Sequence, residues 1–152
     1  MKKSVIYLSF ILLSILASSC SKEAENQRVT DRQLILSYIE ENNLDATGTD
    51  SGLFYIIEEP GSTEHPSENS EFAAFYKGKL LNGKIFEQSH NEPYKGSLNN
   101  VIEGWKEGIP LIGKGGKIQL LIPSHLGYGQ NQSGSIPANS VLLFEVELVD
   151  FS

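Results

Sequence analysis

The stretch VIEGWKEGI, residues 101–109, holds the only tryptophan of the chain and places two glycines inside a predicted short helix. Glycine in a helix interior costs about 1 kcal/mol relative to alanine, so these glycines indicate that another surface comes close to the helix. Ile102, Trp105 and Ile109 are three and four residues apart and therefore share one face. That face is either ordinary hydrophobic core or the floor of a binding pocket, and the composition of the stretch fits both.

Length and charge predict one acidic globular domain with short attachments. The chain has 152 residues and a formal net charge of −7, and a chain of this length suits a single domain. Binding to nucleic acid requires clustered lysine and arginine, and the sequence contains no basic stripe. We therefore expect no nucleic-acid partner.

The amino-terminal segment has the pattern of a secretory signal peptide. Lys2 and Lys3 precede an apolar run from Val5 to Ala17 that only serines interrupt. This run is shorter than the roughly 20 residues that a membrane-spanning helix needs, and it suits the apolar region of a signal peptide. The pattern predicts a signal peptide over residues 1–19.

Cys20, the only cysteine of the chain, directly follows the small residues Ala17, Ser18 and Ser19. This arrangement resembles the lipobox of bacterial lipoproteins, although Ala17 stands where leucine is usual. The resemblance implies an exported protein that is anchored to the bacterial envelope through an acylated, palmitate-bearing Cys20. Of the two membranes, we expect the outer one to hold the anchor. The alternative is an ordinary signal peptide followed by an incidental cysteine.

Residues 20–29 are polar and mixed in charge, which predicts a flexible tether. A helix is predicted over residues 30–46, with Thr30 as its N-cap and Gln33 at capping-box spacing. Such a short helix is unstable alone, so its apolar side chains must dock. We expect them to dock on the chain's own domain, while docking on a second copy, and hence a homodimer, stays open. These side chains recur at helical spacing: Leu34, Ile35, Tyr38 and Ile39.

The composition changes after Ala46, and every glycine and proline of the chain lies from Gly48 onward. Asn82-Gly83 predicts a tight type I′ hairpin turn. With the short helix, the strands predict an α+β domain over residues 50–152 in which the helix lies against an antiparallel sheet. Five segments have strand character: residues 53–59, 71–81, 85–87, 117–123 and 140–151.

The usual constellations of catalytic and metal-binding residues are missing from the sequence. The three histidines are widely spaced, and Cys20 is the predicted amino terminus of the mature chain. We therefore expect neither a metal site nor a cofactor. The sequence has no G-x-S-x-G motif, and GKGGK at 113–117 lacks the spacing of a phosphate loop. Aromatic residues instead lie beside glycines, which favours a concave apolar pocket.

Six blocks, in order, resemble the FKBP-type peptidyl-prolyl isomerases, and the resemblance as a whole extends over about residues 52–152. The resemblance implies a half-barrel antiparallel sheet wrapped around one short helix, here preceded by a short amino-terminal helix. It also implies isomerase activity on proline-containing polypeptides, a possible macrolide ligand, and no cofactor. The blocks are FYKG at 75–78, NGKIFEQS at 82–89, VIEGWKEG at 101–108, IPSHLGYG at 122–129, SIPAN at 135–139 and LFEVEL at 143–148.

The resemblance also implies the residues of the site. Trp105 would be the floor beneath the prolyl ring, with Phe86 and Phe144 as walls. The Ile102 backbone N–H and the Tyr128 hydroxyl would hold substrate carbonyls. Further site residues carried over from the family are Tyr76, Glu87, Tyr94, Val101 and Ile136.

One departure from the family concerns Glu87, because the family usually has aspartate at this position. The alternative function is therefore a catalytically weak chaperone of the same fold, or an accessory lipoprotein of an envelope machine such as the one for gliding motility.

Overall fold

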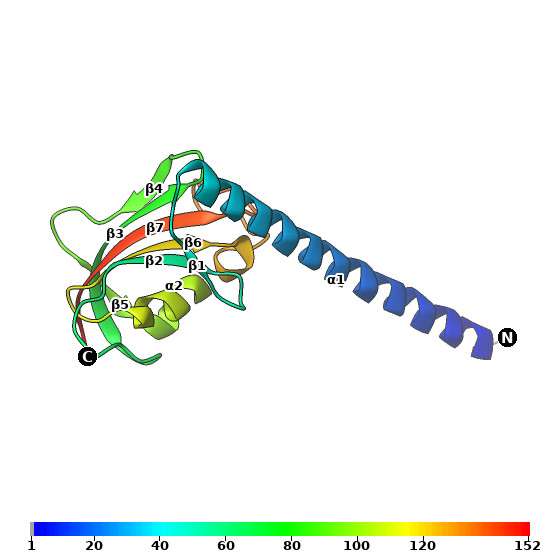
Figure 1. The fold of residues 1–152 in the computed structure, drawn as a ribbon. Helices are drawn as coiled ribbons and strands as arrows, with labels where there is room; N and C mark the ends of the chain where they lie inside the picture. The colour runs from blue at the N-terminus through cyan, green and yellow to red at the C-terminus, as the bar shows by residue number, and fades with distance from the viewer. Residues whose placement is uncertain (1) are drawn as a thin grey trace.

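The computed structural model describes the backbone of residues 2–152 and the side chains of residues 22–152. Met1 and the side chains up to residue 21, on which the predicted signal peptide and the lipidation of Cys20 depend, lie outside this part. Figure 1 shows a curved sheet with one short helix beneath it and one long helix that projects from the domain. The elements are α1 (Lys2–Glu41), β1 (Thr47–Gly48), β2 (Phe54–Glu59), β3 (Glu71–Leu80), β4 (Ile85–Gln88), β5 (Tyr94–Ser97), α2 (Glu103–Gly108), β6 (Lys117–Ile122) and β7 (Leu142–Phe151), with 3-10 turns η1 (Leu98–Asn100), η2 (Ile109–Leu111) and η3 (Ser124–Leu126).

The seven strands form one antiparallel sheet in the order β1-β2-β6-β7-β3-β4. The remaining strand, β5, pairs with the first half of β3, and β4 pairs with its second half. β7 comes last in the sequence but lies in the middle of the sheet, between β6 and β3. The predicted α+β fold with an antiparallel sheet around one short helix is confirmed.

The alternation of residues in β7 decides which face of the sheet is the core. Leu142, Phe144, Val146 and Leu148 are buried in the main core, whereas Glu145 points to the opposite face, where it pairs with lysines of β3. This inward and outward assignment follows from the two-residue period of a strand.

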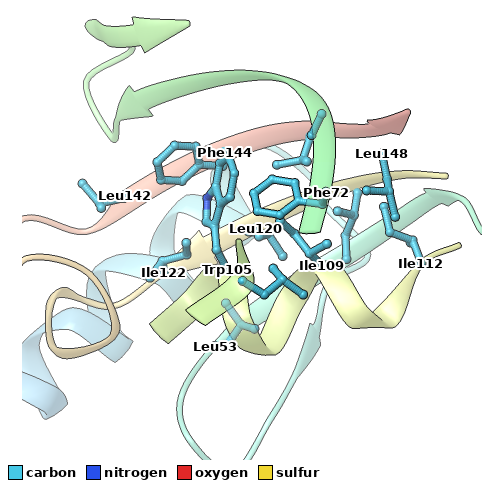
Figure 2. Packing of buried hydrophobic residues seen from close by; sticks show 14 of the residues in the cluster. Leu53, Phe72, Trp105, Ile109, Ile112, Leu120, Ile122, Leu142, Phe144 and Leu148 are labelled. Atoms are coloured by element: carbon cyan, nitrogen blue, oxygen red, sulfur yellow. The ribbon is translucent and has the colours of Figure 1, made fainter. Parts of the chain in front are cut away.

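Helix α2 approaches strand β6 so closely that its two glycines cannot carry side chains. A Cβ atom on Gly104 would lie 2.6 Å from Cγ2 of Ile122, and one on Gly108 would lie 2.5 Å from Cδ2 of Leu120. Figure 2 shows the resulting core, in which Trp105 packs among Phe144 and the other buried side chains. Close approach to the sheet therefore explains why a helix contains these glycines.

Two short strands were not predicted. β5 lies outside the five segments with predicted strand character, and so does β1, which has two residues. Neither is long enough to show a periodic pattern, so pairing with a neighbour defines each of them. β5 is held by residues 71–74 of β3, and β1 is held by the beginning of β2.

The predicted start of the amino-terminal helix at Thr30 is wrong. Thr30 lies inside α1, and its hydroxyl donates to the carbonyl of Asn26 at 3.0 Å instead of capping a helix. Residues 22–29 are helical as well, because this polar segment contains neither glycine nor proline and is rich in helix-forming residues. The helix ends at Glu41, and Asn43 takes a positive φ of 51°, which is typical just after a helix. No helix in the described part of the chain combines the length and the apolar character needed to cross a membrane.

Helix α1 docks on the face of the sheet opposite α2. Ile35 is fully buried there in a second core cluster, to which β2, β6 and the start of β7 also contribute. The guanidinium of Arg32 lies 5.4 Å from the centre of the Phe54 ring, a distance at which a cation and an aromatic face attract. The helix therefore docks on its own domain, as expected, although Leu34 of the predicted stripe is exposed.

We expect Ile35→Ala to lower the free energy of unfolding by about 2 kcal/mol, since it empties a fully buried position under a helix that can settle only partly. The matched control is Leu36→Ala, because Leu36 is the next residue and is 43% exposed. The free energy of unfolding of this variant should stay within about 0.5 kcal/mol of the parent value. Urea unfolding of both variants measures the difference, and equal losses would argue against the docked helix.

Candidate functional site

A cavity of about 410 Å³ opens between α2, the strands around β3 and the loop after β6. This volume falls in the range of roughly 300–1,000 Å³ that small ligands and side chains occupy in proteins. Its lining is mainly aromatic, and its polar side-chain groups are three phenols, one indole N–H, one carboxylate and one amide. The lining residues are Tyr76, Glu87, Tyr94, Asn100, Val101, Ile102, Trp105, Tyr128 and Phe144.

Trp105 of α2 forms the floor of this cavity and is enclosed by the edges of other aromatic rings. The ring centre of Tyr76 lies 5.2 Å from that of Trp105 at an interplanar angle of 84°, and Phe144 lies at 5.2 Å and 82°. Tyr94 approaches at 6.4 Å and 84°. Edge-to-face pairs of this kind each add about 0.5–1.5 kcal/mol beyond simple burial. The indole plane is therefore held in a fixed orientation.

Gly78 of β3 allows the rings of Phe86 and Phe144 to meet. A Cβ atom at this position would lie 2.5 Å from Cε2 of Phe86 and 2.9 Å from Cε1 of Phe144. With glycine there, the Phe86 and Phe144 rings pack edge to face at 5.5 Å and 81°. Phe86 thus supports Phe144 from behind and does not itself line the cavity.

The polar groups of the cavity point to hydrogen bonding with a neutral ligand. Burial raises the pKa of the Tyr76 hydroxyl well above its ordinary range, and the carboxylate of Glu87 adds to the rise through its charge and a hydrogen bond. Burial also raises the pKa of Tyr128, with a smaller contribution from Glu87 and an opposing hydrogen bond with Ser133. Both phenols therefore keep their protons through the physiological range.

One backbone N–H group at the floor is available to a ligand. Ile102 is the N-cap residue of α2, and its carbonyl accepts the Trp105 N–H at 2.9 Å, while the N–H of an N-cap residue lies outside the helical hydrogen-bond ladder. The indole Nε1 of Trp105 is buried and has no hydrogen-bond partner among the described residues. Buried donors are almost always paired, so this unpaired donor is an exception in the packing of the main core.

The raised pKa of Tyr76 predicts how stability responds to alkali. In the unfolded chain the phenol ionises near pH 10, but in the folded protein it does so only at higher pH. Its contribution to stability is therefore complete below about pH 10 and is lost as pH rises further. We expect the unfolding free energy of the parent to fall more steeply above pH 10 than that of Tyr76→Phe, as measured by urea unfolding at several pH values. Parallel curves would contradict the assignment.

The structure brings eight of the ten predicted site residues to this cavity. The other two lie nearby in the packing: Phe86 behind Phe144, and Ile136 buried in the main core. Asn100 lines the cavity but was not predicted; its only sequence signal is its place directly before Val101, at the end of η1. The eight are Tyr76, Glu87, Tyr94, Val101, Ile102, Trp105, Tyr128 and Phe144.

Known proteins share both the sequence pattern and the fold. The model of the FKBP-type peptidyl-prolyl cis-trans isomerase family matches residues 62–149. The chain is 49% identical over 105 residues to FkpA of Buchnera aphidicola subsp. Schizaphis graminum. This alignment covers 67% of this chain and 42% of the relative. It is 38% identical over 131 residues to FkpA of Escherichia coli K12, covering 85% of this chain and 48% of the relative. The chain thus spans about half the length of the curated relatives it matches.

Solved structures agree with this result. The crystal structure of FkpA from Escherichia coli superposes with a TM-score of 0.75 at 33% identity, covering 99% of this chain and 71% of that chain. The crystal structure of AtFKBP13 gives a TM-score of 0.66 at 33% identity, covering 71% of this chain and 99% of that chain. Since the family match, the identities and the fold all agree, the chain belongs to the FKBP-type peptidyl-prolyl cis-trans isomerase family.

Proposed function

We propose that this chain is a peptidyl-prolyl cis-trans isomerase that accelerates rotation about X–Pro bonds in exported or envelope polypeptides. The observation that supports this proposal most is the floor of the cavity, where Trp105 is held by three aromatic edges. A prolyl ring is compact and apolar, so it fits an aromatic cavity of about 410 Å³ with few polar groups.

The mechanism follows from the chemistry of the amide bond. Rotation about a peptide bond has a barrier of about 18–20 kcal/mol because resonance keeps the amide planar. The cis and trans forms of an X–Pro bond are close in energy, so a catalyst needs only to lower this barrier. A twisted amide has lost resonance and part of its dipole, and an apolar cavity therefore favours it over the planar ground state. This is preferential binding of the transition state, to which desolvation contributes.

Each polar group has a place in this mechanism. The Ile102 N–H and the Tyr128 hydroxyl hold substrate carbonyls, which keeps the substrate chain in a turned shape around the prolyl ring. The charge of Glu87 helps to raise the pKa of the Tyr76 hydroxyl, which therefore stays protonated beside the floor. Tyr94 and Val101 flank the ring, and no proton transfer or covalent intermediate is required.

The decisive experiment follows the cis-to-trans relaxation of a Leu-Pro or Phe-Pro peptide in the presence of purified residues 21–152. We expect clear acceleration at micromolar protein. If the relaxation rate equals the uncatalysed rate, the enzyme proposal fails, and a binding module of the same fold, acting as a chaperone or as part of an envelope machine, takes its place.

Removing the support behind Phe144 is expected to weaken catalysis without emptying the cavity. Phe86→Ala deletes one edge-to-face pair worth about 0.5–1.5 kcal/mol, so kcat/KM should fall about two- to tenfold. The matched control is Ile85→Ala, since Ile85 is adjacent in β4 and 48% exposed, and it should leave kcat/KM unchanged. Equal kcat/KM in the parent and in Phe86→Ala would show that support of Phe144 by Phe86 does not contribute to catalysis.

The proposed location is the bacterial envelope, with Cys20 carrying the lipid and the outer membrane preferred. Fractionation of cells that express the full chain tests this directly, because Cys20→Ala should move the protein from the membrane fraction to the soluble fraction. Unchanged membrane association of this variant would contradict lipidation. Macrolide binding is tested separately by titrating the fluorescence of Trp105, which should respond at saturating ligand.

A further inference from the structure

Helix α1 carries a fully buried carboxylate, Asp31, that reaches the base of the loop after β6. One carboxylate oxygen accepts hydrogen bonds from the backbone N–H of Ser124 at 2.8 Å and from its hydroxyl at 2.6 Å. The other oxygen accepts from Nε2 of Gln27 at 2.7 Å. A buried carboxylate is costly unless it is fully hydrogen-bonded, and an apolar side chain such as Ile35 would dock the helix without this cost. The polar link therefore calls for an explanation beyond docking.

Ser124 is hydrogen-bonded to the residues on both sides of Tyr128 in the loop after β6. Its carbonyl oxygen accepts the N–H of Gly127 at 2.9 Å and the N–H of Gly129 at 2.8 Å. The carbonyl of Gly129 in turn accepts the N–H of Asn139 at 2.7 Å, which holds the far end of the loop. Residues on both sides of Tyr128 are thus bonded to the one serine that Asp31 holds.

The adjacent residue, His125, ties the same base of the loop to the other side of the domain. Its Nε2 lies 3.0 Å from the carbonyl oxygen of Ser51, and the Ser51 hydroxyl donates to Glu107 of α2 at 2.7 Å. The base of the loop is therefore held between α2 on one side and α1 on the other. Of these two supports, the one from α1 bonds directly to the serine that organises the Tyr128 turn.

We propose that Asp31 is a positioning residue for the prolyl pocket, acting through Ser124 on the loop that carries Tyr128. The assignment of a substrate-binding role to Tyr128 rests on the proposed function. Without the carboxylate, the N–H and hydroxyl of Ser124 lose their buried acceptor, and the loop must open to bring them to water. Only the fraction of molecules with a closed loop then binds substrate, so the apparent affinity falls by that fraction while the bound state reacts as before.

The test compares three variants of the full chain. Asp31→Ala removes the link, whereas Ile35→Ala loosens the docking of α1 but leaves the link intact. Asp31→Asn keeps an oxygen toward Ser124 and can turn its amide toward the Gln27 side-chain oxygen, so it should restore much of the parent behaviour. The readouts are KM and kcat for a Phe-Pro peptide, the Kd of that peptide from Trp105 fluorescence, and amide hydrogen exchange of residues 125–129.

We expect Asp31→Ala to raise KM and Kd about five- to tenfold with kcat within about twofold of the parent, as expected when only a minor fraction of molecules is competent. Amide exchange should become faster in residues 125–129. Ile35→Ala should speed exchange in α1 but leave KM, Kd and the exchange of residues 125–129 near parent values. Equal effects of the two alanine variants on KM and loop exchange would reduce Asp31 to a docking contact and overturn the proposal.

A second variant keeps the test decisive if Asp31→Ala does not fold. Ser124→Ala removes only the hydroxyl donor and should shift peptide affinity and loop exchange in the same direction by a smaller factor. Parent values for both quantities in Ser124→Ala would then overturn the proposal. If the parent protein itself does not isomerise the peptide, the proposed function fails, while peptide affinity and loop exchange still decide whether Asp31 positions the loop.

Discussion

Replacing Trp105 with alanine is expected to lower the free energy of unfolding by about 3–5 kcal/mol and to abolish binding of prolyl peptides. The side chain is 4% exposed and makes edge-to-face pairs with Tyr76 and Phe144. Truncation of a buried aromatic side chain commonly costs this much, because the cavity left behind closes only partly. Since small domains are stable by only about 5–15 kcal/mol, the loss is a large fraction of the total.

Circular dichroism during urea unfolding measures this loss, because the variant has no tryptophan to follow. Trp105→Phe is the matched control, since it keeps a ring on the floor, and it should lose clearly less stability and retain measurable affinity. A Trp105→Ala protein that is destabilised but still binds the peptide like the parent would assign the indole to the core alone. A variant of unchanged stability would contradict the packing itself.

Replacing Gly104 with alanine is expected to destabilise the domain by about 1–2 kcal/mol, although the same change in an exposed helix is stabilising. Helix propensity alone favours alanine by about 1 kcal/mol. Here the new Cβ atom would meet Ile122 at 2.6 Å, and Ile122 is fully buried and cannot move aside. Overpacking of this kind costs roughly 1–3 kcal/mol and displaces the backbone, so the contact outweighs the propensity.

Urea unfolding again measures the effect, and two further variants sharpen it. Gly108→Ala should behave in the same way, because its Cβ atom would lie 2.5 Å from Leu120. Lys106→Ala in the same helix removes only a surface ion pair with Glu103 and should stay within about 1 kcal/mol of the parent. If Gly104→Ala were as stable as the parent, the close approach of α2 to the sheet would be refuted.

Long elements with a clear period could be predicted from the sequence, whereas elements that depend on partners could not. β7 has ten residues and alternates between apolar and charged side chains from Phe144 to Leu148, so both its existence and its buried face were predictable. β5 has four residues including Gly96, and only its pairing with β3 makes it a strand. The start of α1 was missed because Thr30 and Gln33 imitate a capping box inside a longer helix.

Most residues of the candidate site could be predicted, but which of them line the cavity and which support the lining could not. Periodicity alone left Trp105 between floor and core, and the structure shows that it is buried in the core cluster and also lines the cavity. The resemblance identified eight lining residues, but placing Phe86 behind Phe144 required the contact geometry at Gly78. Asp31 had a signal that was not used, since it lies four residues before Ile35 on the docking face of α1.

The central position of β7 sets the order in which this domain can fold during synthesis. A chain that leaves the ribosome or an export channel amino end first delivers residues 142–151 after both β3 and β6, yet these residues join β6 to β3. Until they arrive, the sheet exists as two separate halves with unpaired inner edges, which invite pairing with other chains. The docking face for α1 also includes Val141 and Leu143. Helix α1 therefore cannot complete its docking until these residues have been made. Nascent chains of this protein therefore keep these two halves unpaired, and prone to aggregation, until β7 has been made.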